Sequence, residues 1–161
     1  MTDEVDDVVS AWARERGDLA LGPMHIWSRI DRLSGILAGH RKRAFTDHAI
    51  EGWEFDVLAA LRRAGRPYRL SPGQLLRETH VTSGTMTNRV DRLAARGLVR
   101  RDPDPDDGRG ALVTLTPAGL ALVDAALASL LTVEESLLGD WPADDRARLA
   151  DYLRRLLLGS A

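Results

Sequence analysis

The sequence predicts a mainly α-helical fold that contains one small β-hairpin. Two observations carry this prediction. Apolar residues recur at helical spacing along most of the chain, and two short strand-like segments flank the polar stretch DPDPDDGRG. The 161 residues fit a single domain that is long enough to bury a core. With 44% hydrophobic and 29% charged residues, the composition is that of an ordinary globular protein.

Three helices are expected in the first part of the chain. Residues 5–16 place valines and Trp12 at helical spacing, and residues 23–44 carry a stripe of isoleucines and leucines. Residues 51–67 form the third helix, which a glycine and a proline end. Because this third helix is apolar around much of its circumference, we expect it to be covered on more than one side.

A second group of helices is separated by a tight break. Ser71 is an N-cap candidate, a proline takes the first helical position, and Gln74 completes a capping box, so a helix begins here. After the break THVT, the stretch SGTMTNRVDRLAARG predicts another helix with Met86, Val90 and Leu93 on its buried side.

Two short strands and two long helices complete the predicted order. Residues 98–101 and 111–115 are the strands, which DPDPDDGRG joins. Residues 117–138 and 143–158 are the helices, and their stripes of leucine and valine need a covering surface. We therefore expect a two-fold homodimer that buries these stripes.

Two helices joined by a tight turn and followed by a hairpin form the winged helix-turn-helix pattern, in which the second helix enters the DNA major groove. The outward face of this helix carries hydroxyls, an amide and a guanidinium, groups that hydrogen-bond base edges and phosphates. Five arginines and one acid, Asp91, lie between residues 89 and 101, although the net charge is −2. A two-fold dimer sets two such helices about one DNA turn apart. The candidate DNA-binding residues are Ser83, Thr85, Thr87, Asn88, Arg89, Arg92 and Arg109.

Arg109 is the one cation of the predicted wing tip. A narrow minor groove has an enhanced negative potential that attracts such an arginine. Asp107 lies two residues before Arg109 and is placed to pair with its guanidinium, whereas Asp104 and Asp106 are expected to form turns.

Composition and spacing exclude several classes of function. Cysteine is absent, which excludes disulfides, thiolate nucleophiles and cysteine metal sites. The four histidines lack metal-ligand spacing, and there is no glycine-rich phosphate loop or nucleophile–base pair, so we expect no enzyme activity, metal or cofactor. No apolar run approaches 18 residues, and the acidic start lacks the basic region of a secretory signal. We therefore expect a cytoplasmic protein without a membrane span.

The stretch from FDVLAALRRAG through LSPGQLLRETHVTSGTMTNRVDRLAARGLVRRDPDPDDGRGALVTLTPAG resembles the multiple antibiotic resistance regulator (MarR) family. The resemblance implies a homodimer with interlocking terminal helices, which binds double-stranded DNA and is released by small ligands. The family pattern has a basic residue between the wing aspartate and the wing arginine. Gly108 stands at that position here, which weakens the expected phosphate contact of the wing.

The stretch WARERGDLALGPMHIWSRIDRL is similar to the extra N-terminal helix of the urate-responsive members of this family. The ligand residues of that subgroup match Trp12, Asp56, Arg89 and Arg101. Urate is a planar anion, so an aromatic face and two guanidinium groups are suited to bind it. Related phenolic or anionic ligands fit equally well. In the free protein Asp56 is expected to hold an arginine of the wing or of the recognition helix, and a ligand would compete for it.

Each of these residues also has a simpler interpretation that involves no ligand. Arg89 can contact phosphate, Asp56 can be a solvated helix residue, and Trp12 can be a packing residue of its apolar stripe. We expect one domain, divided into N-terminal helices for dimerisation and a ligand lid (1–46), a DNA-binding region (47–116) and C-terminal dimerisation helices (117–161).

The predicted function is a ligand-responsive transcriptional regulator, a repressor that binds a pseudo-palindromic operator. The alternative is a winged-helix module that binds protein without specific DNA binding. Exposed aromatic or aliphatic side chains on the outward face of residues 83–96 would favour the module, and this face is polar.

Overall fold

The computed structural model describes residues 2–79, 81–104 and 111–160. This part of the chain has seven helices and three strands: α1 (Glu4–Glu15), α2 (Met24–Thr46), α3 (Gly52–Arg63), β1 (Arg69–Leu70), α4 (Pro72–Thr79), α5 (Ser83–Ala95), β2 (Val99–Pro103), β3 (Ala111–Leu115), α6 (Pro117–Leu138) and α7 (Ala143–Gly159). The order confirms the prediction of a mainly helical fold with a small wing sheet. The third helix ends earlier than predicted, ahead of Gly65, whose φ of 76° stops it.

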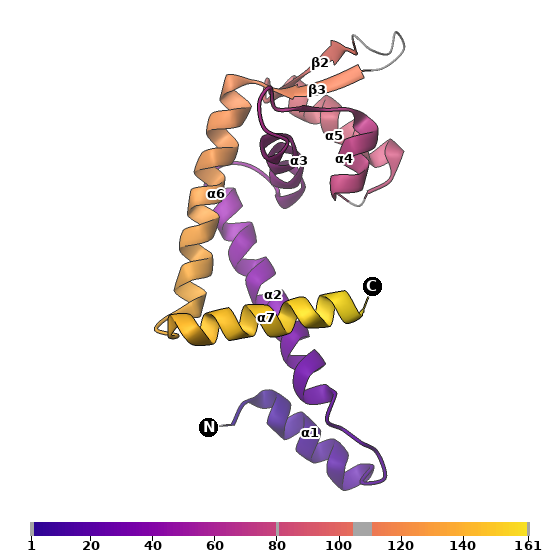
Figure 1. Ribbon diagram of the computed structural model, residues 1–161, viewed down its shortest axis with the longest axis vertical. Helices are drawn as coiled ribbons and strands as arrows, with labels where there is room; N and C mark the ends of the chain where they lie inside the picture. The colour runs from indigo at the N-terminus through magenta and orange to yellow at the C-terminus, as the bar shows by residue number, and fades with distance from the viewer. Residues whose placement is uncertain (1, 80, 105–110, 161) are drawn as a thin grey trace.

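The molecule is elongated, with a head at one end (Figure 1). The head consists of α3, α4, α5 and the small sheet. From it, α6 and α2 extend toward the opposite end, where α1 lies, and α7 turns back across the long axis after α6. The two terminal regions therefore lie outside the head.

The wing sheet has three antiparallel strands in the order β1-β3-β2. Arg101 of β2 faces Val113, and Arg69 of β1 faces Thr114, so β3 is central. The sequence reading missed β1, because two residues carry no period-2 pattern and only pairing with β3 defines them as a strand.

The core of the head joins α3, α4, α5 and the sheet. Leu58, Leu61, Leu75, Met86 and Leu93 are among its largest fully buried side chains. Five successive residues of α3, 57–61, are buried, which confirms that this helix is covered on more than one side. The buried stripe predicted for α5 is confirmed as well.

Phenylalanine stacking attaches the head to α2. The rings of Phe45 in α2 and Phe55 in α3 lie 4.5 Å apart between centroids, at an interplanar angle of 22°. His48, just after α2, lies with its Nε2 2.8 Å from the Ser129 hydroxyl of α6. The end of α2 is therefore fixed against both α3 and α6, which gives the α2–α3 junction a defined geometry.

Ion pairs attach α1 to the N-terminal half of α2. The Arg29 guanidinium donates to both Asp3 and Asp6, at distances of 2.7–2.9 Å, and Arg32 donates to Glu4 at 2.6 Å. The hydrogen bonds from Arg29 hold the pKa of the Asp3 carboxyl below its usual range. The Asp3 backbone N–H, together with Arg29, lowers the pKa of the Asp6 carboxyl. The first helix is thus oriented by charge as well as by its buried valines.

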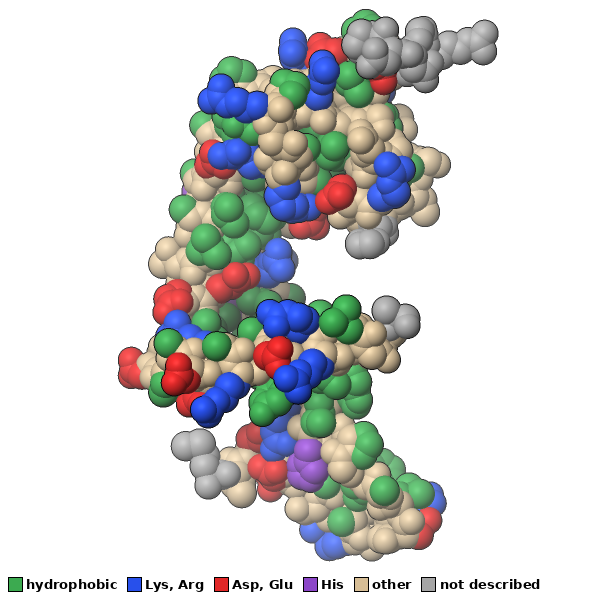
Figure 2. Space-filling view, viewed as in Figure 1, with side chains coloured by type: hydrophobic (Ala, Val, Ile, Leu, Met, Phe, Trp, Pro, Cys, Tyr) green, Lys and Arg blue, Asp and Glu red, His purple; other side chains and the backbone are tan. Residues whose placement is uncertain are grey.

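Large apolar surfaces on α2, α6 and α7 remain uncovered in the single chain. Figure 2 shows hydrophobic side chains along α6 and around α7, and an open gap between α7 and the head. No residue of α7 is buried. The exposed large apolar residues of these three helices are Ile26, Trp27, Leu33, Ile36, Leu127, Leu131, Leu137, Leu138, Leu149, Tyr152, Leu153, Leu157 and Leu158.

One helix of the described residues is long and apolar enough to be a candidate for spanning a membrane. By length and composition alone, α6 is apolar enough to do so. The helix instead has one face in the core, where Val123, Ala126 and Leu130 are buried, and it lies against α2 and α3.

Candidate DNA interface and adjoining cavity

The second helix of the helix-turn-helix, α5, presents a polar face. Its buried residues Met86, Val90 and Leu93 are at most 1% exposed, which fixes the rotation of the helix on the head. Within this fully described helix, no exposed aliphatic side chain is larger than alanine, and none is aromatic. The predicted DNA-binding residues that lie on α5 and are exposed are Ser83, Thr85, Thr87, Asn88 and Arg92, and Arg89 is half-buried.

Two of these predicted residues lie against an aromatic ring of α3. The guanidinium carbon of Arg92 lies 4.7 Å from the Trp53 ring centroid, and that of Arg89 lies 5.4 Å from it. Arg92 also pairs with the Glu51 carboxylate at 3.1 Å, and the Trp53 indole N–H donates to the same carboxylate at 2.8 Å. These two donors lower the pKa of Glu51. Trp53 of α3 and the adjacent Glu51 thus orient these arginines.

A second ion pair between the start of α3 and the end of α5 is less exposed than the Glu51–Arg92 pair. Glu54 of α3 is 3% exposed, and its carboxylate pairs with Arg96, the C-cap of α5, at 2.6 Å. The same guanidinium donates to the Ala49 carbonyl at 2.9 Å, and Glu54 accepts the Glu51 backbone N–H at 2.8 Å. Arg96 therefore links the end of α5 to the start of α3.

Sequence reasoning missed Glu51 and Glu54 as partners of α5. They precede Arg92 and Arg96 by 41 and 42 residues, a separation that no local pattern reveals. One signal was available, because carboxylates three residues apart at the start of a helix fit a capping box.

Arg101 of β2 lies over α5 and not beside Asp56. Its guanidinium pairs with Asp91 at 2.7 Å and approaches the Thr87 carbonyl at 3.4 Å. In the described residues Asp56 makes no ion pair and no side-chain hydrogen bond. Among the described residues, Asp56 therefore does not hold an arginine of the wing or the recognition helix, because Arg101 pairs with Asp91 and Arg89 lies against Trp53.

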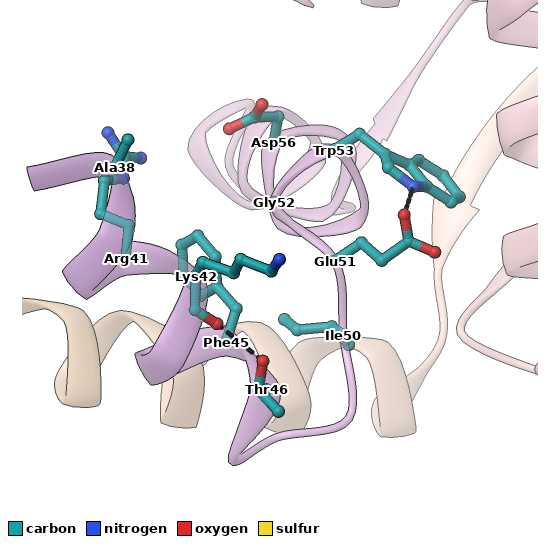
Figure 3. Close-up of a pocket in the computed structure, with 10 residues that line it drawn as sticks. All are labelled: Ala38, Arg41, Lys42, Phe45, Thr46, Ile50, Glu51, Gly52, Trp53 and Asp56. Atoms are coloured by element: carbon teal, nitrogen blue, oxygen red, sulfur yellow. Dashed lines mark hydrogen bonds between the residues drawn. The ribbon is translucent and has the colours of Figure 1, made fainter. Parts of the chain in front are cut away.

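A cavity of about 520 Å³ lies between the C-terminal part of α2 and the start of α3. Figure 3 shows its wall: Arg41, Lys42 and Phe45 come from α2, and Trp53 and Asp56 come from α3. The linker residues Ile50 and Glu51 close it between the helices. Glu51 and Trp53 thus face both the cavity and the arginines of α5.

The structure brings the four subgroup ligand residues together only in part. Asp56 lies in the cavity wall, and Arg89 lies beside Trp53, which is also in that wall. Trp12 is 49% exposed on α1, at the opposite end of the chain from α3 (Figure 1). Arg101 pairs with Asp91 of α5 and is not among the residues that line the cavity. Arg109, predicted for the wing, lies outside the described residues.

Comparison with known proteins agrees with this geometry. A sequence profile of the MarR family matches residues 50–110. The chain is 33% identical to the HTH-type transcriptional regulator PecS of Dickeya dadantii, over 95% of this chain and 92% of that protein. It is 34% identical to the HTH-type transcriptional repressor NicR of Pseudomonas putida, over 69% of this chain and 68% of that protein.

Solved structures of the same fold extend the comparison. A variant of Escherichia coli MarR complexed with operator DNA matches with a TM-score of 0.70 and 25% identity, over 97% of this chain and 99% of that chain. Bordetella bronchiseptica BpsR, whose DNA binding is regulated by 6-hydroxynicotinic acid, matches with a TM-score of 0.68 and 27% identity, over 81% of this chain and 91% of that chain. Together, the fold and these similarities show that the chain belongs to the MarR family of winged helix-turn-helix transcriptional regulators, which bind DNA and are not enzymes.

Proposed function

We propose that the protein is a homodimeric repressor that binds a pseudo-palindromic operator and is released by a planar anionic or phenolic ligand such as urate. The observation that carries the DNA-binding part is the polar face of α5, on which Thr85, Asn88 and Arg92 are exposed while the apolar stripe is buried. These side chains suit base edges and phosphates. The fold of the MarR–operator complex supports the same use of α5.

The dimer part of the proposal rests on the uncovered apolar faces. Helix α7 has no buried residue, and α2 and α6 carry exposed large apolar side chains, so these helices need a partner surface. A second copy of the chain supplies such a surface and places a second α5 about one DNA turn away. In this arrangement residues 1–46 and 117–161 form the dimer, and residues 47–116 bind DNA in the cytoplasm.

The ligand part rests on Asp56 and on similarity to regulated relatives. Asp56 faces a cavity that adjoins the residues holding Arg89 and Arg92. The DNA binding of BpsR is regulated by 6-hydroxynicotinic acid, which is also a planar aromatic acid. In the urate-responsive members that this chain resembles, Trp12, Asp56, Arg89 and Arg101 match the ligand residues. Since Trp12 is remote from Asp56 in one chain, we propose that the partner subunit brings its α1 toward the cavity.

DNA binding by α5 is tested by titrating a labelled duplex from the protein's own promoter and following fluorescence anisotropy. Because arginines neutralise phosphates, the affinity should fall steeply between about 50 and 200 mM salt. Arg92→Ala should weaken binding by about 1–3 kcal/mol, and Arg109→Ala should do the same if the wing enters the minor groove. Arg66→Ala, which removes an exposed arginine that lies outside α5 and outside the helices proposed to form the dimer, is the matched control.

Two results would contradict this part of the proposal. One is an affinity that does not change with salt, and the other is equal binding to the promoter and to random duplex. Either would favour the alternative, a winged-helix module that binds protein. That alternative gains no support from α5, whose exposed face lacks large apolar side chains.

A further inference from the structure

The Glu51 carboxylate occupies two hydrogen-bond donors at the DNA-binding face, one from α3 and one from α5. The Trp53 indole N–H donates to one carboxylate oxygen at 2.8 Å, a bond drawn in Figure 3, and the Arg92 guanidinium donates to the other oxygen at 3.1 Å. The side chains of Glu51 and Arg92 are 61% and 55% exposed. The pair therefore lies at the surface, where another anion can reach the same two donors.

A hollow of about 450 Å³ lies beside these donors, on the face that is proposed to meet DNA. Apart from Trp53, its lining belongs to α5 and consists of Gly84, Thr85, Asn88, Arg89 and Arg92. The backbones of a duplex run along both sides of a helix in the major groove, and half or more of all protein–DNA hydrogen bonds go to phosphate and sugar. We therefore expect a phosphate at this hollow.

The charges around the hollow are not balanced. Its lining contains two guanidinium groups and, among the described residues, no carboxylate. The carboxylates of Glu54 and Asp91 are each paired with another arginine, Arg96 and Arg101. In the described part of the chain, Glu51 is therefore the carboxylate that neutralises a guanidinium of this lining.

We propose that a DNA backbone phosphate replaces the Glu51 carboxylate on the Trp53 indole N–H and the Arg92 guanidinium. Trp53 is then a DNA-contacting residue, and Glu51 is an intramolecular competitor of DNA. A phosphodiester, like a carboxylate, offers two anionic oxygens to two donors. The inference rests on the proposed use of α5 and adds a contact from α3 to it. Because Glu51 must leave before the phosphate binds, and its charge then repels that phosphate, Glu51 lowers the affinity for DNA.

Glu51→Gln on the full-length protein tests the competition. Glutamine keeps the length of the side chain and an oxygen that can accept the Trp53 N–H, but it has no charge. The affinity for the labelled promoter duplex should rise by about three- to tenfold at low salt, because each subunit loses an exposed ion pair that opposes binding. This gain should shrink as salt rises. The matched control is Glu78→Gln, which removes an exposed carboxylate that pairs with Arg63 of α3 and should leave the affinity near that of the parent.

Trp53→Phe tests the phosphate contact, because phenylalanine keeps an aromatic ring beside the two arginines but lacks the N–H donor. The affinity for the promoter should fall by about five- to tenfold. A series of duplexes, each with one neutral methylphosphonate in the backbone, then locates the partner. At the contacted phosphate, the parent protein and Trp53→Phe should bind with nearly equal affinity, since the acceptor of the N–H is weakened for both.

A double variant separates competition from a general effect of charge. In an Arg92→Ala background, Glu51→Gln should change the affinity little, because the guanidinium that both anions seek is absent. Equal gains for Glu51→Gln and Glu78→Gln, or the same gain with and without Arg92, would show that Glu51 does not compete with DNA.

The outcomes also separate this inference from the proposed function. If the parent protein prefers its promoter and Arg92→Ala weakens binding, but Glu51→Gln and Trp53→Phe both bind as the parent does, α5 binds DNA and the inference is wrong. If the parent protein does not prefer its promoter over random duplex, the proposed use of α5 fails, and the inference fails with it.

Discussion

Replacing Gly119 with alanine is expected to lower the free energy of unfolding by about 1–3 kcal/mol or more. Gly119 is buried in the first turn of α6, against the turn that precedes β2. A Cβ at this position would overlap the Leu98 carbonyl oxygen and lie 3.0 Å from its carbon and 3.1 Å from a Leu115 methyl group. Because two of these atoms are backbone, no side-chain rotation relieves the overlap.

The overlap would also break the junction between the wing and α6. Thr116, the N-cap of α6, accepts the Gly119 N–H at 3.0 Å and donates its hydroxyl to the Gly97 carbonyl at 2.7 Å. Its backbone N–H donates to the Leu98 carbonyl at 3.1 Å. Moving α6 away to admit a methyl group stretches these bonds, so the wing should loosen as the helix shifts.

Thermal denaturation followed by circular dichroism measures this effect. For a chain of this size the melting temperature should fall by about 2–4 °C for each kcal/mol. Gly84→Ala is the matched control, because it adds a methyl group to helix α5 where no atom lies within 4 Å. That substitution should leave stability unchanged or raise it by up to about 1 kcal/mol. A Gly119→Ala protein that melts like the parent would contradict the close approach.

Arg96→Ala is expected to be the second most damaging change, at about 1–3 kcal/mol. Among the described residues, it leaves the buried Glu54 carboxylate with only the Glu51 backbone N–H as a partner. It also removes the bond to the Ala49 carbonyl. The penalty arises from an uncompensated buried charge, so it should shrink when that charge is removed too.

The comparison with Arg92 makes this prediction specific. Arg92 is on the same helix and pairs with Glu51, but both side chains are more than half exposed, so Arg92→Ala should cost about 0.5 kcal/mol or less. Urea denaturation of Arg96→Ala, Glu54→Gln and the double variant gives the coupling energy directly. Equal losses for Arg92→Ala and Arg96→Ala, or strictly additive effects in the cycle, would show that the Glu54–Arg96 pair has no special role.

Local patterns sufficed to predict the order of the helices and the face of α5. Apolar spacing predicted which side of α5 is buried, and the capping residue Ser71 marks where α4 begins. These signals lie within one turn of the residues they govern. The small strand β1 was missed, because its existence depends on β3, more than 40 residues later.

Contacts between segments that are distant along the chain could not be predicted from the sequence. Nothing local indicates that Glu54 binds Arg96, that Gly119 touches Leu98, or that Arg101 pairs with Asp91 in place of Asp56. Lys42 was overlooked for the same reason, since its position in the α2 pattern does not reveal that α3 faces it across a cavity. Each of these depends on how α2, α3 and α5 meet in the head.

The most direct test of ligand-responsive DNA binding is to add urate to a preformed complex with a labelled promoter duplex and to record fluorescence anisotropy at constant salt. Allosteric coupling of the usual strength, about 1–3 kcal/mol, weakens DNA binding by about 5- to 150-fold. At a protein concentration just sufficient to bind the duplex, the anisotropy should therefore fall toward that of free DNA. An anisotropy that stays constant at urate concentrations that raise the melting temperature would contradict it, because the ligand would then bind without opposing DNA.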